Sequence, residues 1–112
     1  MKESDITQPV IDKCKQISEH WRMEIYVGCW IICSYLKMDV VVLHHGVSIY
    51  KGELIPIPSI SDCLEKLREL RALSAFGGGA TKAITAFLMG QITITKLHES
   101  LLSALLEVLK ND

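Results

Sequence analysis

The sequence lacks any uncharged segment long enough to span a lipid bilayer. Its longest stretch without a charged side chain, residues 83–95, holds 13 residues, whereas a spanning helix needs about 20 apolar residues. The first eight residues, MKESDITQ, contain no apolar core of the kind that a secretory signal peptide requires. We therefore predict a protein without a membrane span and expect a cytoplasmic location, in which the four cysteines stay reduced.

An excess of charge of one sign is also missing. The chain has 12 Lys and Arg against 13 Asp and Glu, for a net charge of −1, and the basic residues are scattered. Proteins that bind nucleic acids gather basic residues on one face or along one helix. The sequence therefore predicts no nucleic-acid partner.

The local motifs of catalysis and of cofactor or metal binding are absent as well. The chain contains no G-x-S-x-G, H-E-x-x-H, C-x-x-C, G-x-x-x-x-G-K-[ST] or G-x-G-x-x-G pattern. On a strand, Cys29 and Cys33 would lie ~13 Å apart, too far to share a metal ion, and neighbours such as His44 and His45 face opposite sides. We predict no metal and no cofactor. An enzymatic role stays open, but no assembled set of residues favours it.

Apolar residues, by contrast, are plentiful. They make up 49% of the chain, and with the glycines they exceed the roughly 45–50% that is typical of a soluble domain. A chain of 112 residues has room for only one modest core. We therefore expect part of the apolar surface to contact another polypeptide, most simply a second copy of the chain.

The residue pattern predicts an α+β fold in a single domain, residues 1–112. Thr7 and Pro9 are suited to begin a helix that ends near Arg22. The following stretch is rich in β-branched and aromatic residues and predicts a small antiparallel sheet of three to four strands. The expected strands cover residues 24–36, 39–45, 47–50 and 53–57, with a bulge at Gly28, a turn at 37–39 and a hairpin turn at 51–52. Two prolines make the last strand an edge strand.

Two to three C-terminal helices are expected to complete a two-layer arrangement with the sheet and the N-terminal helix. The sequence Ser-x-x-Asp from Ser59 is a capping box and predicts the start of the first of them. A short helical segment follows the glycines and ends at Gly90. Thr93 or Thr95 then caps a final helix that continues to about Lys110.

The final helix is apolar over about half of its circumference at ~100° per residue. Its leucines form two adjacent rows, a broader apolar surface than a helix resting on one sheet requires. His98 lies in the same half. We predict that this surface mediates an interaction through Leu97, Leu101, Leu102, Leu105, Leu106 and Leu109.

The stretch FGGGATK, residues 76–82, is the one candidate for ligand binding. A glycine run before a helix exposes backbone N–H groups, and a nearby lysine and threonine add a cation and a hydroxyl. The run follows a helix rather than a strand, which favours a helix cap and a connection instead. The residues of this anion site would be Gly77, Gly78, Gly79, Thr81 and Lys82.

Two functions are therefore kept. The first is a small protein-interaction module (a regulator, adaptor, chaperone or inhibitor) that acts through an apolar helical surface, with a homodimer expected. An alternative surface for it is the edge strand at residues 53–57, which can add to a partner's sheet. The second is an anion-binding or small-molecule-binding protein, or a small enzyme, that uses the glycine loop and Lys82.

Overall fold

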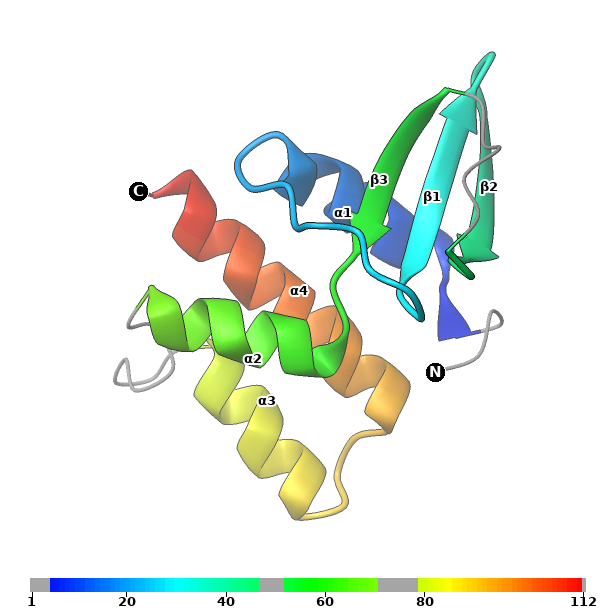
Figure 1. The fold of residues 1–112 in the computed structure, drawn as a ribbon. Coiled ribbons are helices and arrows are strands. Elements are labelled where there is room, and N and C mark those ends of the chain that lie inside the picture. Colours follow the sequence, from blue (N-terminus) through cyan, green and yellow to red (C-terminus); the bar gives the residue numbers. More distant parts are fainter. Residues whose placement is uncertain (1–4, 47–51, 71–78, 112) are drawn as a thin grey trace. The chain divides into compact units, whose positions relative to one another are not determined.

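The computed structural model describes residues 5–46, 52–70 and 79–111. Contacts within the chain divide it into two compact units, Met1–Pro58 and Ser59–Asp112. The first unit contains one helix and a sheet, and the second contains three helices (Figure 1). The structure thus confirms an α+β chain with a three-stranded antiparallel sheet among its described residues. None of the described helices combines the length and the apolar character needed to cross a membrane.

The sheet of the first unit has the strand order β2-β1-β3, with β1 in the centre (Figure 1). The strands are β1 (Trp30–Tyr35), β2 (Met38–Leu43) and β3 (Glu53–Ile57), and both pairings are antiparallel. The side chains of Ile31 and Ile32 are both fully buried. Because neighbours on a strand face opposite sides, β1 is buried on both faces, as its uninterrupted apolar sequence predicted.

The predicted strand over residues 24–36 is too long at its N-terminal end. Residues 26–29 form a tight turn in which the N–H of Cys29 donates to the carbonyl of Tyr26 at 3.1 Å. Gly28 has a φ of 97°, which the third position of a type II turn requires. The expected bulge at Gly28 is present, at the N-terminal end of β1. The N–H of Gly28 donates to the carbonyl of His44 at 2.8 Å and the N–H of His44 donates to the carbonyl of Cys29 at 2.9 Å, so that Gly28 and Cys29 together oppose His44.

The connection between β1 and β2 is a two-residue hairpin turn at Leu36 and Lys37. The flanking residues Tyr35 and Met38 are directly paired. Leu36 and Lys37 have φ values of 50° and 64°, and positive φ at both central positions is the requirement of a type I′ turn. The predicted turn at residues 37–39 is thus placed about one residue too late, because neither residue is of a type that normally favours this conformation.

The third strand is an edge strand, as its two prolines predicted. Pro56 lies opposite Ile31 of β1, and no further described strand lies beyond it. Gly52, just before β3, has a φ of 85°, and a Cβ at this position would overlap the carbonyl oxygen of Ser34. A glycine is therefore needed here for both reasons. The predicted strand 47–50, and Lys51 of the predicted hairpin turn, lie outside the described residues.

Helix α1 (Gln8–Ser18) contacts β3 within the same unit. Its apolar stripe is buried at Val10, Cys14 and Ile17, as the spacing predicted. The helix ends four residues before the predicted end near Arg22, because the N–H of His20 bonds to the carbonyl of Ile17 three residues back. This bond tightens the last turn and ends the regular α-helical pattern.

The second unit consists of α2 (Ile60–Glu69), α3 (Gly79–Leu88) and α4 (Ile94–Lys110), with α2 and α3 both contacting α4. The predicted capping box is present at the start of α2. The Ser59 hydroxyl accepts from the N–H of Asp62 at 3.1 Å, and the Asp62 carboxylate accepts from the N–H of Ser59 at 3.0 Å. Two backbone donors that would otherwise lack helical partners are satisfied in this way.

Helices α3 and α4 also begin and end close to the predicted residues. Gly90 has a φ of 72° and follows α3, and the N–H of Gln91 donates to the carbonyl of Ala86 at 2.8 Å. These are the features of a glycine-terminated helix end. Thr93 is the cap of α4, and its hydroxyl accepts from the N–H of Lys96 at 3.2 Å.

Candidate functional site

The leucines that the sequence placed on an interaction surface are buried in the structure. All lie on α4 and are at most 9% exposed: Leu97, Leu101, Leu102, Leu105, Leu106 and Leu109. His98, which the helical wheel placed in the same apolar half, is also buried. The burial explains why α4 is apolar over half of its circumference. A contact of these leucines with a partner chain stays a prediction.

Large apolar side chains are exposed at the turn that contains Tyr26 and Val27, which are 43% and 68% exposed, and in two larger groups. The first is the hairpin of β1 and β2, where Tyr35, Leu36, Met38 and Val40 are 50–77% exposed. The second is the connection between α3 and α4, where Leu88, Met89 and Ile94 are 52–78% exposed. Single exposed apolar residues are ordinary, but several on one short segment mark a contact surface. The sequence alone did not single out either group.

The hairpin group spans the turn and the start of the outer strand. Tyr35 and Met38 are directly paired across the two strands, and Leu36 is at the turn between them. Val40 follows two residues after Met38, so that both point to the same side of β2. We call Tyr35, Leu36, Met38 and Val40 the hairpin surface.

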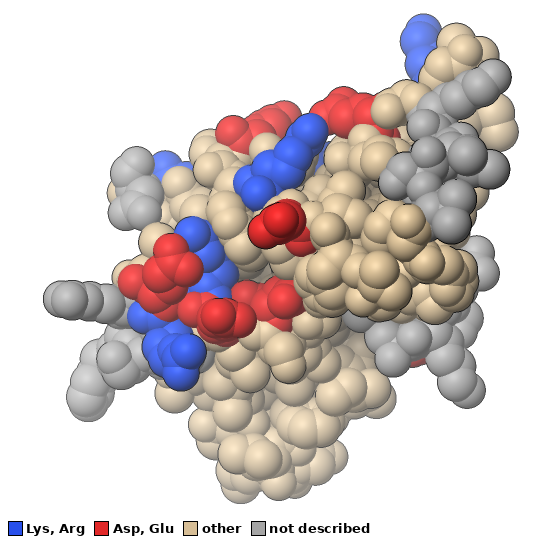
Figure 2. All heavy atoms as spheres, viewed as in Figure 1, with Lys and Arg blue, Asp and Glu red and all other residues tan. Residues whose placement is uncertain are grey.

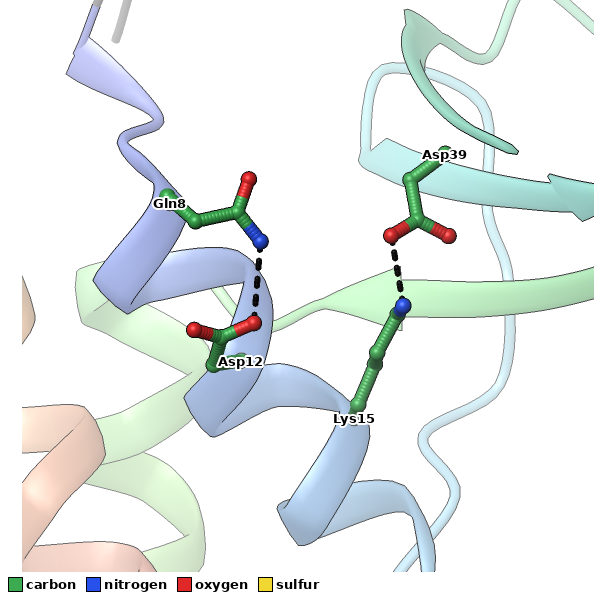
Figure 3. Close-up of polar contacts among 4 residues, drawn as sticks. All are labelled: Gln8, Asp12, Lys15 and Asp39. Atoms are coloured by element: carbon green, nitrogen blue, oxygen red, sulfur yellow. Dashed lines mark hydrogen bonds and ion pairs between the residues drawn. The ribbon is translucent and has the colours of Figure 1, made fainter. Parts of the chain in front are cut away.

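The two outer strands of the sheet differ in how open they are to a further strand. Pro56 in β3 has no N–H to donate, and Glu53 at its start pairs with Arg22 at 2.6 Å. Proline and charge on an edge strand discourage pairing with another chain. β2 (MDVVVL) has no proline, and its single charged residue, Asp39, is bound by Lys15 of α1 at 2.5 Å (Figure 3). Of the two edges, β2 is therefore the more open to pairing.

The hydrogen bond from Lys15 also sets the protonation of Asp39. This bond, aided by a bond from Ser34, lowers the pKa of the Asp39 carboxyl below its usual value against a smaller opposing effect of burial. The carboxylate therefore keeps its charge to a lower pH than an ordinary aspartate does. Figure 3 shows the Lys15 side chain pointing from α1 toward Asp39 on β2, while Gln8 and Asp12 bond along α1 itself.

The predicted glycine-loop site is described only in part. Gly77 and Gly78 lie outside the described residues, whereas Gly79 is the first residue of α3. Thr81 and Lys82 are exposed in the first turns of that helix. The prediction that this loop binds an anion is therefore neither supported nor contradicted by the described residues.

The structure adds a groove between α3 and α4 that the sequence did not predict. Its volume is about 400 Å³, and small residues form its walls, namely Gly79, Ala83, Ala86 and Ala104. A Cβ placed on Gly79 would lie 3.7 Å from the Cβ of Ala104, which is ordinary van der Waals contact. The small side chains leave the groove shallow and open rather than filled.

Positively charged, negatively charged and hydroxyl side chains line this groove. Lys82 of α3 and Lys96 of α4 supply two ammonium groups, Ser100 and Ser103 supply hydroxyls, and Glu107 supplies a carboxylate. Neither ammonium forms an ion pair with another described residue. Fourteen positions separate the two lysines in the sequence, and only the packing of α3 on α4 brings them to one groove.

The face of the second unit that Figure 2 presents is divided by charge. Charged side chains gather over α2, whereas the atoms over α3 belong to uncharged residues (Figure 2). The only charged residue of α3 is Lys82. The cation of this helix is therefore confined to the groove, and the rest of α3 presents uncharged surface.

The cysteines and histidines form no recognisable site within the described part of the chain. Cys14, Cys29 and Cys63 are buried and Cys33 is half-buried, all as free thiols. Burial raises the pKa of Cys14 to about 12 and also raises the pKa of Cys33. No group of three or more His, Cys, Asp or Glu among the described residues is placed to hold a metal ion.

Comparison with known proteins gave no relative from which a family or function follows. No protein-family model, no curated protein sequence and no solved structure matches the chain.

Proposed function

We propose that this protein is a small protein–protein interaction module that acts as a homodimer. The observation that carries the proposal is the hairpin surface, in which four large apolar side chains are exposed along one turn and the start of one strand. Leaving this surface in water is unfavourable by roughly 25 cal/mol for each Å² of apolar area. A second polypeptide that covers it recovers this free energy.

The proposed contact is an antiparallel pairing of β2 with β2 of a second copy. No strand among the described residues pairs with the outer edge of β2, and in the proposed dimer the backbone N–H and C=O groups of this edge extend the sheet into the second copy. A two-fold axis at Val40 brings the exposed Met38 and Val40 side chains of both copies to one side. It does not place the two Asp39 carboxylates directly opposite each other, which avoids the repulsion of like charges.

Charge at the strand edge is the test of this interface. Val40→Lys places a charged side chain on a position that is 51% exposed, so we expect it to leave the chain folded and to prevent strand pairing. Ile94→Lys is the matched control, because Ile94 is 52% exposed and lies on α4. Molar mass is measured by light scattering and by sedimentation equilibrium over a range of concentrations, and circular dichroism checks the fold.

We expect a dimer for the unaltered chain and for Ile94→Lys, and a monomer for Val40→Lys. A monomer at every concentration of the unaltered chain would contradict the homodimer. A dimer that survives Val40→Lys would instead direct attention to the leucine rows of α4 as the dimer surface.

A further inference from the structure

We propose that the groove between α3 and α4 binds an acidic amphipathic segment of a partner protein. This site is distinct from the hairpin surface and does not depend on the homodimer. The proposal rests on three observations about the described residues: two lysines in one groove that form no ion pair with another described residue, walls made of small residues, and an apolar lining that includes Ile92.

The first observation is the charge of the groove. Lys82 and Lys96 both line it, and neither ammonium is neutralised by another described residue. Lys96 also lies in the first turn of α4, which has no acidic residue. A cation is unfavourable near a helix N-terminus, where the helix dipole is positive, and an anion is favourable there. A carboxylate bound beside Lys96 therefore interacts favourably with both the ammonium and the helix.

The second observation is the shape of the groove. Gly79, Ala83, Ala86 and Ala104 allow the backbone of a bound segment to approach both helices closely, and the groove is open along its length. The hydroxyls of Ser100 and Ser103 lie on the α4 side. The Ser103 hydroxyl donates to the Glu99 carbonyl at 3.1 Å, so toward the segment it offers only an acceptor oxygen. Helical peptides commonly dock in grooves of this kind between two helices.

The third observation concerns the apolar residues of the groove, which indicate that the bound segment carries apolar as well as acidic side chains. Ile92, in the connection between the two helices, lines the groove together with the small residues and the two lysines. A segment with acidic side chains toward the lysines and leucine-like side chains toward Ile92 and the alanines satisfies both. Glu107 lies at the other end of α4 from Lys96, so an acidic side chain beside Lys96 is kept away from this carboxylate.

Synthetic peptides test the proposal. The probe is a fluorescently labelled amphipathic helical peptide of about four turns with Glu on one face and Leu on the other, and its control carries Gln in place of Glu. We expect the Glu peptide to bind with a dissociation constant of about 10–100 µM, a value in the range of transient contacts. NMR amide shifts should be centred on the lining residues, and added salt should weaken binding.

Variants of the full chain assign the binding to the groove. Charge reversal in Lys82→Glu together with Lys96→Glu should weaken binding of the Glu peptide by about tenfold or more, whereas arginine at both positions should preserve it. Lys110→Glu is the control for each single reversal, Lys82→Glu or Lys96→Glu, because it makes the same change of charge on an exposed residue of α4 that does not line the groove.

The proposal is overturned if the Glu peptide does not bind, if the Gln peptide binds equally well, or if the double reversal leaves binding unchanged. Binding of free glutamate and of inorganic phosphate is measured as well. If either binds as tightly as the peptide at the same lysines, the groove is a small-anion site and not a docking surface. Failure of any of these arms leaves the mass measurements on Val40→Lys unaffected, so the two proposals are tested separately.

Discussion

The ammonium of Lys15 on α1 lies 2.5 Å from a carboxylate oxygen of Asp39 on β2, a strand that is not the one α1 packs against most extensively. Twenty-four positions separate the two in the sequence. The contact joins the N-terminal helix to the outer strand of the sheet and keeps the sole carboxylate of that strand occupied. The ion pair therefore links α1 to β2. It also neutralises the one charge on β2 that would discourage this edge strand from pairing with another strand.

The first prediction concerns the pH dependence of this link. Since the pKa of Asp39 is lowered in the folded chain, its contribution to stability is present above the unfolded-state pKa of about 3.9 and is lost as pH falls through the folded value. We expect Asp39→Asn to lower the free energy of unfolding by less than about 1 kcal/mol at pH 7, since the pair is partly exposed.

The difference between Asp39→Asn and the unaltered chain should vanish toward about pH 2, where both forms lack the charge. Urea denaturation at several pH values measures it, and Asp12→Asn serves as a control on a carboxylate that bonds only along α1. Equal stabilities of Asp39→Asn and the unaltered chain at pH 7 would mean that the contact contributes nothing measurable.

The second prediction concerns the turn at Leu36 and Lys37. Non-glycine residues with positive φ carry a cost of roughly 1–2 kcal/mol each, and Asn-Gly is the sequence that type I′ turns favour. Replacement of Leu36 and Lys37 by Asn and Gly should raise the free energy of unfolding by about 1 kcal/mol, as measured by urea denaturation. Because the same change removes an apolar side chain that is 77% exposed, we also expect a weaker dimer.

The reversed sequence, Gly-Asn, and an Ala-Ala pair are informative controls for the turn. Ala-Ala removes the exposed leucine without relieving the backbone, so it should weaken the dimer and leave the stability of the monomer unimproved. If the Asn-Gly variant is less stable than the unaltered chain, the contacts of the Leu36 side chain stabilise the fold by more than the strained backbone of the turn destabilises it.

The third prediction concerns Gly52. Its φ of 85°, and the overlap that a Cβ at this position would have with the Ser34 carbonyl oxygen, leave no room for a side chain. We expect Gly52→Ala to destabilise the chain by about 2 kcal/mol or more, through both backbone strain and steric overlap. Gly28→Ala is a useful comparison, because Gly28 also has positive φ but a Cβ there meets no atom within 4 Å.

The effect of Gly28→Ala should accordingly be the smaller of the two, near the roughly 1 kcal/mol that the backbone conformation costs by itself. Thermal and urea unfolding of both variants check the order. An equal loss for the two glycines would indicate that β1 moves away from Gly52 without cost.

The fourth prediction concerns thiol reactivity. The thiolate is the reactive form of cysteine, and burial both blocks access to Cys14 and raises its pKa to about 12. Cys33 is half-buried, so a maleimide or disulfide reagent should modify it first at pH 8, followed by the other three only after unfolding. Mass spectrometry of the labelled peptides identifies the order, and early labelling of Cys14 would contradict its burial.

The sequence by itself determined the helices of this protein, because the interactions that begin and end a helix lie within a few residues. The Ser59–Asp62 capping box, the Thr93 cap and the glycine at position 90 all join neighbours in the chain. The periodic apolar residues of α1 likewise identified side chains that are buried, whereas the leucines of α4, which we expected on an interaction surface, are buried in the structure. The sequence also indicated a central apolar strand and a proline-marked edge strand.

Only the tertiary structure decided what those elements expose. The order β2-β1-β3 depends on pairings between residues far apart in the chain, and the exposure of the hairpin surface depends on which elements pack against the sheet. The same holds for Lys82 and Lys96, which lie on different helices and meet at one groove only because α3 packs on α4. Local pattern fixes the backbone of a segment, whereas burial and proximity are settled by which segments pack together. The surplus of apolar residues was therefore visible in the sequence, but its location was not.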